Sequence, residues 1–472
     1  MAILPSYREL HLNKNSNGYR PAGRDRVGLA ARVVGSMLVE MVLSKNASLD
    51  ALCDEAGGLA ALRALPLHDR RLARAIAVTA LRQRPVILAA LNSLLDRPLP
   101  RKAEHLLATL QVAAAQILFM NVPQSAAVNL AVTAVSEDVR SRRFAPLANA
   151  VLRRLADDRE ALSMLVPAPR DSFNSFLSAQ LASDHGRERL RAISEAIRIE
   201  PAIDLTIGGH VSAERRSVLM HELDAAVLPN ETFRLRNKVD DLKLLPGYSE
   251  GEWWVQDAAA SLPARMLGEV AGLKVADLCA APGGKTAQLA SAGALVTAVD
   301  KSARRMKRLR ENLARLRLEA ELVEADLLEW KPGPVFDAVI LDAPCSATGT
   351  MRRHPEIAWN VEAEQVNALA RLQHEMIMAA SAMVKPGGTI VYVNCSILKR
   401  EGEDLLAAII RADCGLRHVR LSAGELAGAD FAINGQGALR TLPGDRFGER
   451  AEELGMDGFF ACRFETVGTN RV

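Results

Sequence analysis

The sequence predicts an α/β protein in which an all-α region and a small α+β segment precede the alternating part. Two patterns support this fold class. Residues 271–472 alternate short apolar runs with amphipathic stretches, which is typical of α/β proteins. Residues 26–160 instead repeat apolar side chains at helical spacing. Prolines and short strand-like runs lie between them, so we expect a linker and a separate small unit over 161–270.

The all-α region is predicted to be a small helical bundle. Its first apolar stripe repeats every four residues: Leu29, Val33, Met37 and Met41. Basic side chains give the bundle charged faces: Arg70, Arg71, Arg74, Arg82, Arg84, Arg140, Arg142 and Arg143. Such faces are either solvated helix surface or a contact for nucleic-acid phosphates, and the pattern leaves both open. Residues 1–25 are interpreted as a flexible, mildly basic arm, or as a terminus without a role.

The middle segment is predicted to combine short strands with one helix. The strands are Ile203–Ile207, Glu231–Arg236, Leu242–Leu245 and Glu252–Val255, and the helix is Ala213–Ala226. Trp253 and Trp254 are adjacent, so on a strand their side chains point to opposite faces. We expect one indole in the core, and the other is either buried as well or free to stack on a base.

The alternating region is predicted to form a sheet of parallel strands. The strands are Val275–Leu278, Leu295–Val299, Glu321–Glu324, Ala338–Leu341 and Thr389–Val393, with His418–Leu421 and Gly458–Phe464 as later candidates. The helix predicted over 302–317 has one apolar stripe, and arginines and lysines cover most of its remaining surface.

Composition limits the classes of function. The net charge of +3 is too small to indicate a nucleic-acid partner, so only local charge can argue for one. The six cysteines contain no CxxC pair and no Cys/His cluster with zinc spacing, so we expect no metal site, no disulfide framework and a reducing cytoplasm. No apolar run reaches the roughly 18 residues of a membrane span, and the N-terminus has no signal-peptide core.

Residues 336–359 hold the densest group of chemically reactive side chains. A buried strand ends at Asp342, and Cys345 follows three residues later. Ligands bind at the carboxyl ends of parallel strands in open α/β sheets. The cationic pair Arg352 and Arg353 comes next and would suit an anionic substrate.

A second thiol, Cys395, follows the fifth predicted strand. A lone cysteine would be interpreted as an inert buried side chain, but two at strand ends favour a nucleophile. A free cysteine has a pKa of about 8.5, so a nearby cation is needed to favour the thiolate near neutrality. The candidate cations are Lys285, Arg352, Arg353, Lys399 and Arg400.

A glycine-rich turn, from Asp277 to Lys285, follows the first strand and opens a helix. Gly283 and Gly284 would permit a tight turn and close approach of the backbone to a ligand. The Gly-Lys-Thr ending invites a P-loop interpretation. That motif requires glycine where this chain has Cys279, so a nucleoside triphosphatase ranks low.

Three carboxylates follow successive strands. Asp300 ends the second strand about 20 residues after the turn, the position of an acid that binds ribose hydroxyls in doubly wound folds. Asp326 follows the third strand and Asp342 the fourth. Together with the turn, they favour a nucleoside pocket.

These motifs carry a family resemblance. DLCAAPGGKT, VDKS, LDAPCSATGTMRRHPEIAW, VNCS and MDGFF resemble the RNA cytosine-C5 methyltransferase family, in particular its bacterial 16S ribosomal-RNA Sun/Fmu branch. The helical region resembles the NusB-like domain that this branch carries. The resemblance spans about Arg26 to Phe464, and its catalytic-domain motifs are highly specific. It implies a Rossmann-like class I methyltransferase domain over 271–472, with RNA recognition by the two preceding regions.

The resemblance implies S-adenosylmethionine as the cofactor. The turn would surround its methionine part through Cys279, Ala280, Ala281, Pro282, Gly283, Gly284 and Lys285. Asp300 would hold the ribose, Asp326 would lie by the adenine, and Asp342 would border the same pocket.

The resemblance also implies catalytic roles. Cys395 would attack C6 of the target cytosine, so that C5 becomes nucleophilic enough to take a methyl group. Cys345 would help to remove the C5 proton and expel Cys395, and Asp342 would contact the N3/N4 edge of the base. The sequence departs from the family at Asn394, where threonine is usual, and the LVEAD segment that contains Asp326 is a looser match.

The sequence therefore predicts a cytoplasmic, monomeric RNA (cytosine-5-)-methyltransferase that acts on 16S or another ribosomal RNA. The alternative is a non-catalytic RNA-binding assembly factor with the same fold. Retention of both Cys345 and Cys395 argues against that alternative. Which cytosine is modified does not follow from the sequence.

Overall fold

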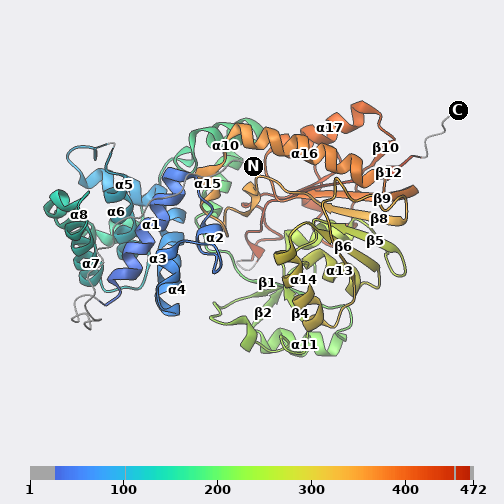
Figure 1. Ribbon diagram of the computed structural model, residues 1–472, viewed down its shortest axis with the longest axis horizontal. Helices are drawn as coiled ribbons and strands as arrows, with labels where there is room; N and C mark the ends of the chain where they lie inside the picture. The colour runs from blue at the N-terminus through green and yellow to red at the C-terminus, as the bar shows by residue number, and fades with distance from the viewer. Residues whose placement is uncertain (1–26, 101, 451–452, 468–472) are drawn as a thin grey trace.

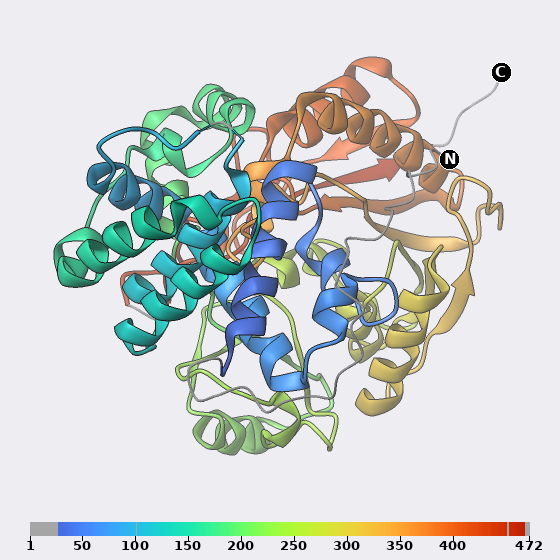
Figure 2. The same cartoon turned by 60° about the vertical axis from the view of Figure 1, so that its left-hand side comes forward.

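The computed structural model describes residues 27–100, 102–450 and 453–467. A helical part lies at one end of the molecule, a large sheet with helices on both faces lies at the other, and a small sheet packs against the second part (Figure 1). Seen from the side, the helical part stands in front of the other two (Figure 2). The predicted arm, residues 1–25, lies outside the described residues.

The helical part is built around one buried helix, α6. Its helices are α1 (Leu29–Lys45), α2 (Leu49–Leu52), α3 (Ala60–Arg63), α4 (Leu67–Arg82), α5 (Arg84–Leu94), α6 (Glu104–Phe119), α7 (Gln124–Glu137), α8 (Ala145–Asp157) and α9 (Arg159–Ser163). Nearly every side chain of α6 is buried, including the run Ala113, Ala114 and Ala115. A helix that is apolar on all sides belongs inside a bundle, and its small side chains let α1, α4, α7 and α8 approach it closely.

The helix α10 (Ser175–Ala196), which is kinked at Gly186 (φ 79°, ψ 171°), connects the helical part to the rest of the chain. Asn174 caps it: the Asn174 Oδ1 accepts a hydrogen bond from the Leu177 N–H (2.8 Å), and its Nδ2 donates to the Val361 carbonyl (2.8 Å). The helix therefore starts in a fixed position against the segment that contains Val361.

The middle segment forms a small antiparallel sheet with the strand order β2-β3-β1-β4. The strands are β1 (Asp204–Ile207), β2 (Ala225–Val227), β3 (Phe233–Leu235) and β4 (Trp253–Val255), and α11 (Ala213–Glu222) packs beside them. The predicted helix is too long, because the chain turns at Asp224 with a φ of 45° and then enters β2. The predicted strand over 242–245 is wrong, since Leu242–Leu244 forms a 3-10 turn. Trp253 and Trp254 are both buried, so neither is free to stack on a base.

The large sheet has the order β10-β12-β9-β8-β5-β6-β7, with β11 paired to β12. Its strands are β5 (Lys274–Leu278), β6 (Leu295–Asp300), β7 (Glu321–Glu324), β8 (Phe336–Asp342), β9 (Val384–Asn394), β10 (Leu416–Val419), β11 (Leu439–Arg440) and β12 (Phe460–Thr466). The five strands β5 to β9 run parallel, and β12 joins β9 antiparallel. The predicted α/β class is confirmed.

Alternate residues of each central strand enter different cores. Val339 and Leu341 pack with α16 (Ala363–Ser381) and α17 (Glu403–Ala412), whereas Ala338 and Ile340 pack with α12 (Leu262–Arg265) and α13 (Gly284–Ser291). A further helix, α14 (Ala303–Leu316), covers β6. Because both faces are covered, the strands are continuous apolar runs in the sequence.

The helical part docks on residues 352–362, the segment that follows the cysteine-bearing loop after β8. The Arg82 Nη2 donates a hydrogen bond to the Arg352 carbonyl (2.9 Å), and the Trp359 Nε1 donates to the Leu81 carbonyl (3.2 Å). The indole of Trp359 also packs against the core of the helical bundle. The two parts thus share polar and apolar contacts.

Two arginines predicted on the basic faces of the bundle belong to this interface instead. Arg82 makes the bond just described, and the Arg84 guanidinium lies 4.4 Å from the ring centroid of Trp359. Burial lowers the pKa of Arg84 to about 10. Arg142 and Arg143 remain exposed.

Within the described residues, every helix is too short or too polar to cross a membrane.

Candidate active site

The predicted site residues gather at the carboxyl ends of the parallel strands β5 to β9. The strand order reverses between β5 and β8, and this is the position at which open α/β sheets bind ligands. The turn after β5 contains Gly283 with a φ of +104°, a conformation that favours glycine. A Cβ at Gly283 would lie 2.1 Å from the Leu309 Cδ1, so this glycine lets α13 and α14 pack closely.

Asp277 and Cys279 form the buried base of the turn. The Asp277 Oδ2 accepts a hydrogen bond from the Thr286 hydroxyl (2.6 Å), while its Oδ1 has no partner among the described residues. Burial raises the pKa of Asp277 to about 7 and that of Cys279 to about 12. Cys279 is therefore a neutral thiol at physiological pH.

Lys285, in the first turn of α13, reaches across to the end of β8. Its Nζ lies 2.7 Å from the Asp342 Oδ2. Burial is the largest single effect and would lower the pKa of Lys285, but the Asp342 carboxylate, together with the charges of Asp277 and Cys395, outweighs burial and the pKa is raised. The Lys285 side chain is 8% exposed and that of Asp342 is 35% exposed, so the carboxylate is the half of the pair open to a ligand.

Asp300 closes the turn from the side of β6. Its Oδ2 accepts a hydrogen bond from the Ala281 N–H (3.3 Å), and its Oδ1 accepts from the Ser302 N–H (2.9 Å). The Arg305 Nη2 also lies 2.9 Å from Oδ1. Asp300 is buried, so these contacts hold the carboxylate in one orientation beside the turn.

Asp326 is more open than Asp300. Its Oδ1 accepts a hydrogen bond from the Leu328 N–H (3.0 Å), and the Lys301 Nζ lies 3.9 Å from its Oδ2. Its side chain is 42% exposed. The structure therefore places a fixed carboxylate at β6 and a solvent-facing one after β7.

The two predicted thiols meet. The Sγ atoms of Cys345 and Cys395 lie 3.3 Å apart, although 50 residues separate them in the sequence. Cys345 follows β8 and Cys395 follows β9, which are adjacent parallel strands. The hydrogen bond with Cys395, followed by burial, raises the pKa of Cys345 well above its usual value. Cys345 is thus the protonated member of the pair.

Opposite charges flank the two sulfur atoms. A Cys395 thiolate is one of the negative charges that raise the pKa of Lys285. The Glu401 carboxylate is one of the negative charges that raise the pKa of Cys345. The Glu401 anion therefore disfavours charge on Cys345.

Glu401 was not predicted from the sequence. It lies in the charged run LKREGED, which resembles exposed surface, yet its side chain is fully buried. It accepts hydrogen bonds from Ser346 and Ser396, the residues that directly follow the two cysteines. No signal in the sequence alone distinguishes it from its charged neighbours.

The expectation that Arg352 and Arg353 face an anionic substrate is wrong. The Arg353 Nη2 lies 2.7 Å from the Asp257 Oδ2, and its Nε lies 2.8 Å from the Asp457 Oδ2. Arg352 is 4% exposed and lies 3.9 Å from Asp457. Both arginines are held in ion pairs that join the cysteine loop to two other segments, although 27% of the Arg353 side chain is exposed. Of the other candidate cations, Arg400 is exposed and donates to Asn367.

The loop that carries Cys345 is also fixed by a contact between two glycines. The Gly349 N–H donates to the Cys395 carbonyl (2.8 Å), and the Gly458 N–H donates to the Gly349 carbonyl (2.9 Å). A Cβ at Gly349 would lie 1.8 Å from the Gly458 carbonyl oxygen. Only glycine allows the three segments to approach this closely.

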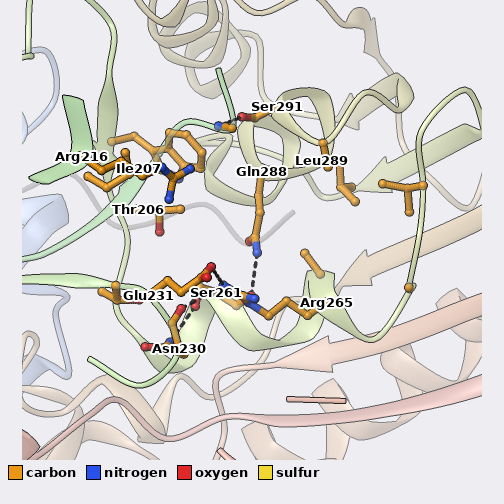
Figure 3. A pocket seen from close by; sticks show the side chains of 17 residues that line it. Thr206, Ile207, Arg216, Asn230, Glu231, Ser261, Arg265, Gln288, Leu289 and Ser291 are labelled. Atoms are coloured by element: carbon orange, nitrogen blue, oxygen red, sulfur yellow. Dashed lines mark hydrogen bonds and ion pairs between the residues drawn. The ribbon is translucent and has the colours of Figure 1, made fainter. Parts of the chain in front are cut away.

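A separate cavity of about 270 Å³ lies between the small sheet and α13 (Figure 3). Thr206 and Arg216 line it from the small sheet side, and Gln288 and Ser291 line it from α13. None of the predicted site residues lines this cavity. No group of three or more His, Cys, Asp or Glu side chains that could hold a metal ion occurs in residues 27–100, 102–450 and 453–467.

The strand order and the glycine turn at the point of reversal define a Rossmann-like methyltransferase fold. The family model for 16S rRNA methyltransferase RsmB/F matches residues 265–465, and that for the NusB family matches residues 29–157. The chain belongs to this family of small-subunit ribosomal RNA methyltransferases, with a NusB-like helical region.

Relatives agree with this assignment, and a solved structure shares the fold. Ribosomal RNA small subunit methyltransferase B of Vibrio cholerae serotype O1 is 34% identical over 83% of this chain and 88% of its own length. The protein of the same name from Xylella fastidiosa strain Temecula1 is 33% identical over 92% of this chain and 98% of its own. The crystal structure of PH0851 superposes with a TM-score of 0.64 at 20% identity, covering 92% of this chain and 99% of that chain.

Proposed function

We propose that the protein transfers a methyl group from S-adenosylmethionine to C5 of a cytosine in ribosomal RNA, through a covalent bond between Cys395 and C6. The observation that carries this proposal is the pair of sulfur atoms 3.3 Å apart at the ends of β8 and β9. A ribosomal RNA substrate agrees with the names of the relatives.

The residues at the turn fit the cofactor. Asp300 presents a fixed carboxylate suited to ribose hydroxyls, and Asp326 presents a solvent-facing one further along the same edge. The turn from Cys279 to Gly284 would hold the methionine part. When bound, S-adenosylmethionine supplies an electrophilic methyl group.

The surrounding charges support Cys395 as the nucleophile. Cytosine C5 is a weak nucleophile until C6 carries an adduct, so a thiolate is required first. A Cys395 thiolate would attract the Lys285 ammonium, whose pKa it helps to raise, while the Lys285 partner Asp342 is open to contact the N3/N4 edge of the base. The base must leave any stack to reach these groups.

Cys345 is then suited to remove the C5 proton. The main cause of its raised pKa is the hydrogen bond with Cys395. Bond formation between Cys395 and C6 removes that cause, so Cys345 can release its proton to water. The Cys345 thiolate next takes the proton from methylated C5, and the C6–Sγ bond breaks to return the Cys395 thiolate.

The proposed roles of the two thiols predict different outcomes for the variants that lack one of them. Cys395→Ala should form no covalent RNA complex and transfer no methyl group. Cys345→Ala should methylate once and then stay attached to the RNA, in a complex that survives denaturing electrophoresis. The double variant is the control and should show no complex.

If Cys395→Ala forms the covalent RNA complex and Cys345→Ala does not, the roles of Cys345 and Cys395 are the reverse of those proposed. If neither single variant forms a complex, covalent catalysis is rejected. Bisulfite sequencing of ribosomal RNA from cells with and without the gene identifies the modified cytosine. RNA binding without methyl transfer by the unaltered protein would favour an assembly factor instead.

A further inference from the structure

Glu401 is a fully buried carboxylate with four hydrogen-bond donors around it. Its Oε1 accepts from the Ser346 N–H (2.9 Å) and from the Gln373 Nε2 (2.9 Å). Its Oε2 accepts from the Ser346 hydroxyl and from the Ser396 hydroxyl (2.6 Å). A buried carboxylate is costly unless it is hydrogen-bonded, so this arrangement requires every donor to stay in place.

The donors belong to both loops of the candidate active site. Ser346 directly follows Cys345, and Ser396 directly follows Cys395. A single carboxylate group therefore joins the two loops. The two hydroxyls also lie 3.1 Å from each other, which closes the network between the loops.

The backbone of Glu401 is also held by hydrogen bonds. The Asn394 Nδ2 donates to the Glu401 carbonyl (2.8 Å), and so does the Tyr392 hydroxyl (2.9 Å). The Asn394 Oδ1 accepts from the Ser396 N–H (2.8 Å). Asn394, the departure from the usual threonine, thus supports both Glu401 and the loop of Cys395.

We propose that Glu401 is a positioning residue: through Ser346 and Ser396 it sets the separation of Cys345 and Cys395. The negative charge of Glu401 also disfavours the thiolate form of Cys345. The catalytic consequence rests on the proposed methyl transfer. The effect on the two thiols is a property of the protein alone and is measurable without RNA.

Glu401→Gln is the variant that tests this role. A glutamine amide can still accept from the Ser346 N–H and the Gln373 Nε2 with its oxygen. Its NH₂ group can donate to the two serine hydroxyls, which rotate to accept. The fold is therefore expected to remain, whereas the negative charge next to Cys345 is lost.

The measurement is the rate of iodoacetamide alkylation of Cys345 and Cys395 between pH 6 and 10, read by peptide mass spectrometry on the full chain. In Glu401→Gln, the alkylation profile of Cys345 should move to lower pH by at least about half a unit, because removal of a nearby negative charge favours the thiolate. In RNA methylation, kcat should fall at least about tenfold. The KM for RNA and the affinity for S-adenosylmethionine should change less than about threefold.

Glu403→Gln is the matched control. Glu403 is a mostly buried carboxylate two residues further on, and it pairs with Arg440 rather than with the serines. This variant should leave the alkylation profile of Cys345 unchanged. If Glu401→Gln does not fold, the Ser346→Ala and Ser396→Ala variants replace it and should lower kcat in the same way.

An unchanged Cys345 profile together with an unchanged kcat in Glu401→Gln overturns the proposal. An equal shift of the profile in Glu403→Gln also overturns it, because any buried carboxylate on this segment would then suffice. If the unaltered protein transfers no methyl group, the proposed function fails, and the alkylation profile still decides the role of Glu401.

Discussion

Burial gives Asp277 a proton affinity unlike that of an ordinary aspartate, because burial outweighs the opposing effect of the Thr286 hydrogen bond and of Lys285. The Asp277 carboxyl lies at the base of the glycine-rich turn after β5. One of its oxygens has no partner among the described residues, and its pKa is raised to about 7. An unfolded aspartate has a pKa of about 3.9. The folded chain therefore binds more protons than the unfolded chain between these two values.

This difference predicts that stability falls as pH rises from about 4 to about 7, on the order of 4 kcal/mol from Asp277 alone. Asp277→Asn carries no titrating group, so its melting temperature relative to the unaltered protein should rise over that window. Thermal unfolding of both proteins at pH 5 and pH 7.5 measures this difference in melting temperature. Asp404→Asn, at an exposed position of α17, is the control and should show no such trend. Parallel pH profiles for Asp277→Asn and the unaltered protein would contradict the prediction.

The residues that the sequence predicted best are those whose position follows from a strand end. Asp300, Asp342, Cys345 and Cys395 were placed together because parallel strands finish at one edge of a sheet. Glu401 was not found, because its burial depends on packing between loops far apart in the sequence. The ion pairs of Arg352 and Arg353 were missed for the same reason, since their acidic partners come from other segments.

At the level of elements, backbone contact between loops limits which side chains the site tolerates. Gly349→Ala would place a Cβ 1.8 Å from the Gly458 carbonyl oxygen and 2.8 Å from the Cys395 carbonyl oxygen. The surrounding backbone would have to move, and overpacking of this kind typically costs about 1–3 kcal/mol. Thermal unfolding should show the loss of stability, and methyl transfer should fall because the cysteine loops separate.

Gly435→Ala is the control for this change. A Cβ there meets no atom within 4 Å, and the residue has no positive φ. Its stability should stay within about 0.5 kcal/mol of the unaltered protein. Equal stability of Gly349→Ala and Gly435→Ala would mean that the loops can separate without loss.

The elements themselves were predictable where periodicity is strong. The strands β5 to β8 and α14 lie close to their predicted bounds, because covered strands and an amphipathic helix leave clear patterns. The strand β9 begins at Val384, earlier than the predicted Thr389. The short strands β2 and β11 were missed: β2 has three residues and β11 has two, too few for a period to appear. Pairing with neighbouring strands, rather than local sequence, defines them.

At the scale of the whole molecule, exposed arginines of the helical part are expected to hold RNA phosphates. Arg71, Arg142 and Arg143 are exposed, whereas Arg82 and Arg84 are buried at the interface. Reversal of the three exposed charges to Glu in the full chain should weaken RNA binding uniformly across sequences. The slope of log K against log salt should fall by about 0.7 per lost phosphate contact with single-stranded RNA.

Filter binding at several salt concentrations measures this slope. Arg417→Glu is the control, because Arg417 is exposed on β10 and pairs with Glu465 across the sheet. An unchanged slope in the triple variant would mean that these faces of the bundle are only solvated.

The docking of the helical part on residues 352–362 sets a limit on how this protein can be recombined. A chimaera that exchanged residues 29–157 alone would place a foreign core against the Trp359 indole and would leave the Arg352 carbonyl without the Arg82 donor. The smallest unit that can be exchanged with its contacts intact is therefore the bundle together with residues 352–362.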